Sequence, residues 1–293
     1  MRVLVVGAGQ MGSGIAQVCA QAGHEVLLND RDAKFIERGI RSIEQNLDRA
    51  VEKGRMKPEE RGRVLSHIDP RPHFSDLDVA IAIEAATENL ELKLEIFRRL
   101  NESTAPETIL ASNTSSISIT KLAAVVDNPG RVIGMHFMNP VPVMKLVEVI
   151  RAIQTTDATA KFVHDLAADL GKTTAESRDF PGFIANRILM PLINEAVYAL
   201  QNGVGTADAI DTVAKLGLNH PMGPLELADL IGLDTCLAIM EVLYDGIGDQ
   251  KYAPCALLRQ YVDAGWYGRK TGRGFYLYEG GRKVSATPEA VLA

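Results

Sequence analysis

The stretch RVLVVGAGQMG, at residues 2–12, decides how the first part of this chain folds. Its valine-rich run is typical of a strand buried in a parallel sheet. Glycines follow at the G-x-G-x-x-G spacing, and residues 13–22 then carry apolar side chains at helical spacing. In that context Gly7 would turn the chain off the strand, Gly9 would let a pyrophosphate approach the backbone, and Gly12 would let the helix pack on the strand. The stretch therefore predicts a phosphate-binding turn at a helix start.

An acidic residue ends the next apolar strand. That strand covers residues 25–29, and Asp30 follows it, eighteen residues after Gly12. A carboxylate there can accept both ribose hydroxyls of an adenosine and would repel a 2′-phosphate, which favours NAD. Arg31 follows immediately and could pair with that phosphate, so NADP stays open as the second candidate. A glycine triplet in a loop would be an ordinary turn, but strand, helix and acid together predict a dinucleotide site.

Composition excludes several other classes of protein. The 293 residues allow two domains, and 46% hydrophobic with 23% charged residues is ordinary for a globular enzyme. A net charge of −6 gives no basic surface for nucleic acid. No apolar stretch approaches a membrane span, so we expect no membrane partner. The cysteines at 19, 236 and 255 are scattered without metal-ligand spacing, which predicts free thiols, no metal site and a cytoplasmic location.

The pattern of elements changes once along the chain. Up to the Pro181-Gly182 pair, predicted strands at 78–83, 109–111, 131–136 and 144–149 alternate with predicted helices at 33–53, 58–65, 88–100 and 158–170. Beyond it come helices at 183–201, 206–215, 224–230, 233–243 and 255–264, with almost no strand signal. We predict an α/β fold: a Rossmann-like, doubly wound parallel sheet in a dinucleotide-binding domain (1–182), then an all-helical substrate and dimerisation domain (183–293). The tail, 287–293, is expected to lack regular structure.

The segment GMHFMNPVPVMKLVE, at residues 134–148, carries the best candidates for chemistry. His136 stands at the carboxyl end of a predicted strand, where open α/β sheets bind ligands. Glu148 follows on the return strand of a hairpin turned by two prolines, which can bring a carboxylate beside the imidazole. A neutral histidine held in one tautomer suits removal of the hydroxyl proton when an alcohol gives up a hydride. The alternative is a buried histidine satisfied by the sheet, with Glu148 at a strand end.

Several motifs together resemble one enzyme family. The 134–149 segment, SNTSS at 112–116, PGFIANR at 181–187 and GLNHPMGP at 217–224 resemble the 3-hydroxyacyl-CoA dehydrogenases, and the resemblance runs from Val3 to about Tyr278. In length the chain is similar to their short bacterial 3-hydroxybutyryl-CoA type. The resemblance implies NAD-dependent hydride transfer between an L-3-hydroxyacyl-CoA and its 3-keto product, an acyl-CoA substrate such as 3-hydroxybutyryl-CoA or acetoacetyl-CoA, and a place in fatty-acid β-oxidation.

The resemblance also implies the catalytic residues. His136 would be the general base of alcohol oxidation and the general acid of the reverse reaction, with Glu148 orienting it. Asn186 would help to hold the substrate and the histidine, and Ser115 would touch the substrate's reacting end. Taken alone, Asn186 could simply be a polar residue at a helix start and Ser115 a helix cap.

Cofactor and substrate contacts are implied in the same way. The glycine motif and the resemblance together place at the cofactor Gly7, Gly9, Gln10, Met11, Gly12, Asp30, Glu88, Lys93, Asn113, Ser115, Asn139 and Lys270. Lys53, with Ser115 and Asn186, would meet the acyl-CoA. Asn46 stands where some relatives have a serine near CoA, a departure from the pattern. The alternatives are a solvated helix face for Glu88 and Lys93, a turn residue for Asn139 and a basic surface around Lys53.

Two other functions, and the pairing of two copies of the chain into a dimer, remain open at this point. A dehydrogenase of the same build could act on a free hydroxy acid such as L-gulonate. A dinucleotide-binding sensor without catalysis is disfavoured because His136, Glu148 and Asn186 are all present. The helix at 183–201 carries an apolar face that would pair two copies into a dimer or pack within its own domain: Ile188, Leu189, Leu192, Ala196 and Leu200.

Overall fold

The computed structural model describes residues 1–73 and 77–287. Its chain divides into two compact units, Met1–Phe180 and Pro181–Ala293, which are taken one at a time below. The predicted tail lies outside the described residues from position 288 onward.

The first unit is built on one eight-stranded sheet. Its strand order is β3-β2-β1-β4-β5-β6-β7-β8, and the described neighbours pair in parallel except β6 and β7, which are antiparallel. The strands are β1 (Arg2–Val6), β2 (Glu25–Asn29), β3 (Ile68–Pro70), β4 (Ile81–Glu84), β5 (Ile109–Ser112), β6 (Val132–Phe137), β7 (Leu146–Arg151) and β8 (Thr173–Arg178). The chain runs outward from β1 to β3 and then crosses back to β4. The carboxyl ends of β1 and β4 therefore meet at the switch point where such sheets bind ligands.

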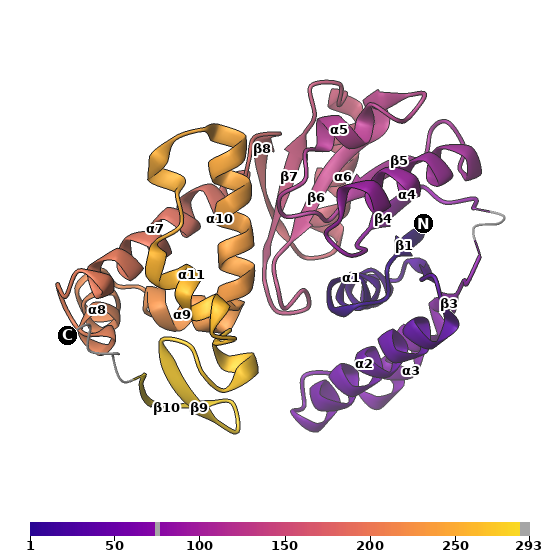
Figure 1. The fold of residues 1–293 in the computed structure, drawn as a ribbon. Helices are drawn as coiled ribbons and strands as arrows, with labels where there is room; N and C mark the ends of the chain where they lie inside the picture. The colour runs from indigo at the N-terminus through magenta and orange to yellow at the C-terminus, as the bar shows by residue number, and fades with distance from the viewer. Residues whose placement is uncertain (74–76, 288–293) are drawn as a thin grey trace. The chain divides into compact units, whose positions relative to one another are not determined.

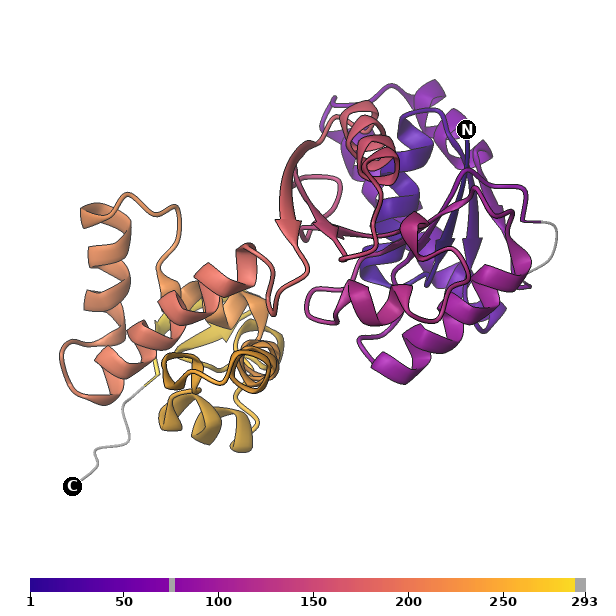
Figure 2. The ribbon, with the colours of Figure 1, turned by 90° about the horizontal axis from the view of Figure 1, so that it is seen from above.

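Helices cover both faces of this sheet (Figures 1 and 2), which explains why its central strands are buried along their whole length. The helices are α1 (Gln10–Gln21), α2 (Ala33–Glu52), α3 (Pro58–Ser66), α4 (Leu90–Ser103), α5 (Ile119–Ala123) and α6 (Asp157–Asp169), with a 3-10 turn at Pro129–Arg131. Side chains of Asp32, Asn89, Ser118 and Thr156 cap α2, α4, α5 and α6. By contrast α1 follows Gly9, which has no side chain to offer, so its first N–H groups remain available to an anion.

The two edge strands of the sheet, β3 and β8, were not predicted from the sequence. β3 spans three residues, and β8 has the largely polar sequence TTAESR. A short or polar edge strand carries little apolar pattern, because only one of its edges and part of its surface are buried.

Over residues 181–287, the second unit packs five α-helices around an apolar core that includes Met190, Ile193, Leu225 and Phe275. The helices are α7 (Ala185–Gln201), α8 (Ala207–Thr212), α9 (Pro224–Ile231), α10 (Leu233–Ile247) and α11 (Ala256–Asp263). A π-helical turn follows α8 at Val213–Gly217, and 3-10 turns occupy Gln250–Tyr252 and Arg269–Thr271. The predicted helices are thus present, with α8 shorter than expected.

The second unit is mainly helical, as predicted, but it also contains two short strands that an all-helical unit would lack. β9 (Tyr276–Glu279) and β10 (Arg282–Ala286) form an antiparallel hairpin. Gly280 and Gly281 make its turn with φ values of 56° and 77°, the left-handed backbone that a two-residue hairpin loop requires. The adjacent glycines after the alternating tyrosines 276 and 278 were a hairpin signal that helical periodicity elsewhere in the unit obscured.

Two buried carboxylates hold that hairpin. Asp229 accepts hydrogen bonds from the N–H groups of Phe275 and Tyr276, both at 2.9 Å, and from the Tyr278 hydroxyl at 3.0 Å. Asp211 accepts from the Tyr276 hydroxyl at 2.8 Å. Burial raises the pKa of Asp229 to about 6, although its hydrogen bonds act in the opposite direction. The hairpin thus depends on partners distant in sequence.

Candidate active site

The glycine motif has the geometry of a phosphate-binding turn. Gly7 has a φ of 102°, and a Cβ atom there would lie 2.7 Å from the carbonyl oxygen of Ala85. A Cβ on Gly12 would lie 1.7 Å from the carbonyl oxygen of Gly7, whereas one on Gly9 would have no described atom within 4 Å. Gly7 and Gly12 are therefore required by turn and packing, and Gly9 keeps the outer side of the turn open. An open turn at an uncapped helix start fits a dinucleotide's pyrophosphate.

Asp30 ties the end of β2 to that turn. One carboxylate oxygen accepts from the Ala8 N–H and the other from the Arg31 N–H, each at 2.8 Å. The Arg31 guanidinium lies 5.1 Å from the ring centre of Phe35 in the first turns of α2. An acid fixed at this edge, next to the open turn, has the position at which such folds hold the adenosine ribose.

His136 and Glu148 form the predicted pair. They lie directly opposite each other in the antiparallel register of β6 and β7, and His136 Nδ1 is 2.9 Å from Glu148 Oε2. The two residues are 8% and 1% exposed, so their interaction is little screened by water. A carboxylate at Nδ1 favours the tautomer with its proton on that nitrogen, which makes Nε2 the basic nitrogen.

The turn between β6 and β7 lies against the dinucleotide turn. The Asn139 side chain accepts a hydrogen bond from Gln10 Nε2 at 3.1 Å, and Asn113 accepts from the Phe137 N–H at 2.9 Å. The ammonium of Lys172, which follows α6, donates to the carbonyl oxygens of Val141 at 2.6 Å and Met144 at 2.8 Å. Sequence reasoning missed Lys172, because a surface lysine carries no signal for such a contact.

The loop that carries Ser115 is fixed by Glu88. A single oxygen of this carboxylate accepts from the hydroxyls of Thr114 at 2.6 Å and Ser116 at 2.8 Å, and from the N–H of Ser115 at 3.0 Å. Burial raises the pKa of Glu88, but the charge of Lys93 and the hydrogen bonds from this loop outweigh burial and lower it overall. Glu88 precedes α4 and organises a neighbouring loop.

Lys93 is not part of a solvated helix face, so that alternative is wrong for this residue. Its side chain is 1% exposed, and its ammonium lies 2.6 Å from Glu84 Oε1 and 3.2 Å from the carbonyl oxygen of Ala86. Glu84 itself is fully buried. The sequence showed Glu84 only as the residue that ends a strand.

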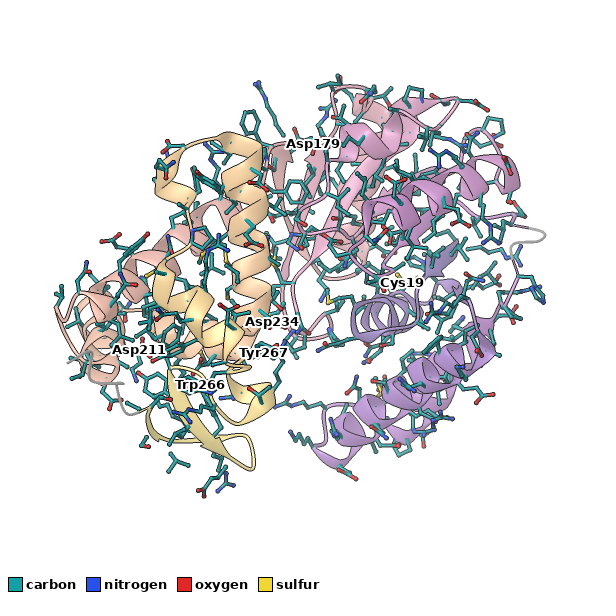
Figure 3. All side chains as sticks on the ribbon, viewed as in Figure 1. Cys19, Asp179, Asp211, Asp234, Trp266 and Tyr267 are labelled. Atoms are coloured by element: carbon teal, nitrogen blue, oxygen red, sulfur yellow. The ribbon has the colours of Figure 1, made fainter. Side chains whose placement is uncertain are left out.

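The helix after the Ser115 loop has a long-range cap. Besides Ser118, the carboxylate of Asp179 accepts from the N–H groups of Ile119 at 3.1 Å and Thr120 at 2.7 Å (Figure 3). Ser118 and Asp179, and not Ser115, therefore cap this helix.

The remaining candidates lie apart from this cluster or in the second unit. Lys53 is an exposed residue at the end of α2, and Asn46 donates to the Gln17 side chain at 3.3 Å. In the second unit, Asn186 is buried in the first turn of α7. Lys270 contacts both carboxylate oxygens of Asp234, which Figure 3 labels, at 2.6 and 2.7 Å.

The three cysteines lie in the interior of the protein. Cys19, Cys236 and Cys255 are buried and unpaired, and burial raises the pKa of Cys19 and Cys236 to about 12 (Figure 3 labels Cys19). Over residues 1–73 and 77–287 no group of three or more histidine, cysteine or acidic side chains could hold a metal ion. No helix in those ranges is long and apolar enough to cross a membrane.

The first unit combines a dinucleotide-binding sheet with a histidine–carboxylate pair at its ligand-binding edge, the arrangement of an NAD-binding oxidoreductase. The sequence matches the family model of the 3-hydroxyacyl-CoA dehydrogenase NAD binding domain over residues 2–180 and that of the C-terminal domain over residues 182–278. The chain belongs to the 3-hydroxyacyl-CoA dehydrogenase family, which confirms the resemblance, the fold class and NAD as the cofactor.

Relatives of known name cover nearly the whole chain. A 3-hydroxybutyryl-CoA dehydrogenase of Bradyrhizobium diazoefficiens is 55% identical over 284 residues, which is 97% of each chain. Another from Clostridioides difficile is 46% identical, over 95% of this chain and 99% of the relative. The crystal structure of the (S)-3-hydroxybutyryl-CoA dehydrogenase of Ralstonia eutropha is 49% identical with a TM-score of 0.92, and the match covers 95% of this chain and 99% of that one.

Proposed function

We propose that this protein interconverts L-3-hydroxybutyryl-CoA and acetoacetyl-CoA with NAD as the redox partner. The observation that carries the proposal is the 2.9 Å contact between His136 and Glu148 at the ligand-binding edge of the sheet. The named substrate of the relatives supports the choice of acyl group. NAD supplies the hydride acceptor when it is bound, and the glycine turn with Asp30 would hold it.

In this proposal each protein group has one task. His136 removes the proton of the 3-hydroxyl during oxidation and returns it to the 3-oxygen during reduction. Glu148 keeps the imidazole in the required tautomer and stabilises the imidazolium while the proton resides there. Asn186 would donate a hydrogen bond to the 3-oxygen as charge develops on it.

The other contacts are proposed on the strength of the family resemblance. For the cofactor these are Gln10, Met11, Glu88, Lys93, Asn113, Ser115, Asn139 and Lys270. Lys53, Ser115 and Asn186 are proposed for the acyl-CoA. The Glu88 and Asn139 side chains already take part in the cluster at the carboxyl ends of the strands, which supports their inclusion.

A direct assay tests the proposal. Purified protein is mixed with acetoacetyl-CoA and NADH, and the loss of NADH absorbance is followed. NADPH replaces NADH in a second series, and L-gulonate with NAD is the substrate in a third. We expect turnover with acetoacetyl-CoA and NADH and a weaker reaction with NADPH. Activity confined to L-gulonate would replace the proposed substrate, and NADH binding without turnover on either substrate would point to a sensor.

We also propose that the protein forms a homodimer through its helical unit. On α7, Ile188 is 67% and Leu192 40% exposed one turn apart, while Ala196 and Leu200 of the predicted apolar face are buried. Light scattering should give twice the 31.8 kDa chain mass for the wild type and a lower mass for Ile188→Glu. Val204→Glu, at a 78% exposed position beyond α7, is the matched control and should leave the mass unchanged. A monomeric wild type contradicts this proposal.

A further inference from the structure

A buried ion pair connects three strand ends in the first unit. Glu84 is the last residue of β4 and lies in register with Val6 at the end of β1 and Ser112 at the end of β5. Its Oε1 accepts from Lys93 Nζ and from the Ala86 N–H, and its Oε2 accepts from the Ser112 hydroxyl, each at 2.6 Å. Three short hydrogen bonds thus fix a carboxylate that has no exposure to water.

Two routes lead from this pair to the loop that carries Ser115. In the first, the Ser112 hydroxyl that donates to Glu84 also accepts from the Thr114 N–H at 3.2 Å. In the second, the Lys93 ammonium lies 3.5 Å from Glu88 Oε2, and the other oxygen of Glu88 holds the backbone and hydroxyl groups of residues 114–116. The first route ends on Thr114, and the second ends on residues 114–116, which include it.

The pair also lies close to the dinucleotide turn. Glu84 accepts a hydrogen bond from the backbone N–H of Ala86. The preceding residue, Ala85, has the carbonyl oxygen that leaves no room for a side chain at Gly7. A shift of Glu84 would therefore move the backbone on which Gly7 rests.

Stability alone does not explain two buried charges here. Removing a carboxylate and an ammonium from water costs much of what their attraction returns, and apolar residues of similar size often replace such pairs without loss. Glu84 and Lys93 nevertheless occupy 0% and 1% exposed positions at the ligand-binding edge of the sheet. A buried ion pair can be worth its desolvation cost where it holds reacting groups in place, because misplacement by about 1 Å can lower a rate about a hundredfold.

We propose that Glu84 and Lys93 are positioning residues, whose ion pair fixes the 112–116 loop through Ser112 and Glu88 and so places Ser115 for the reaction. Lys93 then acts on this loop through Glu88. This inference rests on the proposed dehydrogenase activity for its catalytic readout and on the loop itself for its structural readout.

The test compares Glu84→Gln, Lys93→Met and the double variant with the wild type. Each single variant leaves one buried charge without its partner and should unfold at a clearly lower temperature, whereas the double variant should recover most of that loss. In the double variant we expect kcat for acetoacetyl-CoA reduction to fall at least about tenfold, and by a larger factor than the NADH dissociation constant rises. Hydrogen exchange of the amides at 113–118 should accelerate at least about tenfold, with α6 unchanged.

Two further variants keep the test decisive. Ser112→Ala removes one route without stranding a charge, and we expect a folded protein with a lower kcat and a nearly unchanged KM for acetoacetyl-CoA. Asp165→Asn/Lys161→Met removes a 2.6 Å ion pair on the exposed side of α6 and should leave every readout at the wild-type value.

The outcomes separate the two proposals. A wild type that binds NADH but does not reduce acetoacetyl-CoA refutes the proposed substrate, and the exchange rates at 113–118 still decide the positioning role. Wild-type kcat in Ser112→Ala together with unchanged exchange at 113–118 in the charge variants would overturn the positioning role, even if the enzyme is active.

Discussion

Replacing Glu148 by glutamine removes one negative charge from the catalytic pair and almost no volume. The carboxylate oxygen lies 2.9 Å from His136 Nδ1, and Glu148 is 1% exposed. A hydrogen bond to a charged group contributes about 1.5–3 kcal/mol. Because the imidazole becomes positively charged only when it takes the substrate's proton, this stabilisation acts mainly in the transition state.

The expected loss of rate follows from these values. Each 1.36 kcal/mol of lost transition-state stabilisation lowers a rate tenfold, so about 1.5–3 kcal/mol corresponds to a roughly 10- to 150-fold lower kcat. The low exposure of the pair favours the upper part of that range, since little water screens the interaction. The KM for L-3-hydroxybutyryl-CoA in the oxidation direction should change much less, because His136 is uncharged before it takes the proton and then needs the carboxylate less.

Steady-state kinetics of L-3-hydroxybutyryl-CoA oxidation with NAD measures this loss, and thermal unfolding shows whether the variant keeps its fold. Glu176→Gln is the matched control, because Glu176 Oε2 lies 3.2 Å from His164 Nε2 in an exposed histidine–glutamate pair. It should retain wild-type kinetics. A folded Glu148→Gln protein with wild-type kcat would show that the carboxylate has no part in the proton transfer.

Three further outcomes are expected. Asp30→Asn should reduce the preference for NADH over NADPH at least about tenfold in kcat/KM, because it removes a charge that repels a 2′-phosphate; an unchanged ratio would exclude that role. Lys172→Met should raise the KM for NADH several-fold by loosening the turn that carries Asn139, with Lys161→Met as an unaffected control on α6, and equal KM values in the two variants would count against it. The pKa of Asp229 is about 6 in the folded protein against 3.8 ordinarily, so this group stabilises the fold at low pH and loses that contribution as pH rises through 6. Urea unfolding should therefore show the stability difference between wild type and Asp229→Asn growing by up to about 3 kcal/mol from pH 7 to pH 4, and a pH-independent difference would contradict the shift.

The features that could be predicted from the sequence are local in the chain. The glycine turn needs only residues 2–12 and the acid at the end of the next strand. His136 and Glu148 lie twelve positions apart in one hairpin, so their spacing and the prolines between them were sufficient to bring them together. In both cases one or two elements of secondary structure determine the geometry.

The features that could not be predicted depend on contacts between distant residues. Glu84 meets Ser112 across 28 positions, and Asp229 meets Phe275 across 46. A glutamate at a strand end or a lysine in a helix has the same local pattern whether it faces water or a buried partner. Lys93 therefore resembled a surface residue until the fold placed it against Glu84.

The most direct test of the catalytic account is the turnover of His136→Gln with acetoacetyl-CoA and NADH, measured beside its affinity for NADH. General acid catalysis contributes at least about a hundredfold in this direction, so kcat should fall by that factor or more while the NADH dissociation constant stays within about threefold of the wild-type value. A variant that binds NADH normally and retains wild-type turnover would show that His136 does not transfer the proton.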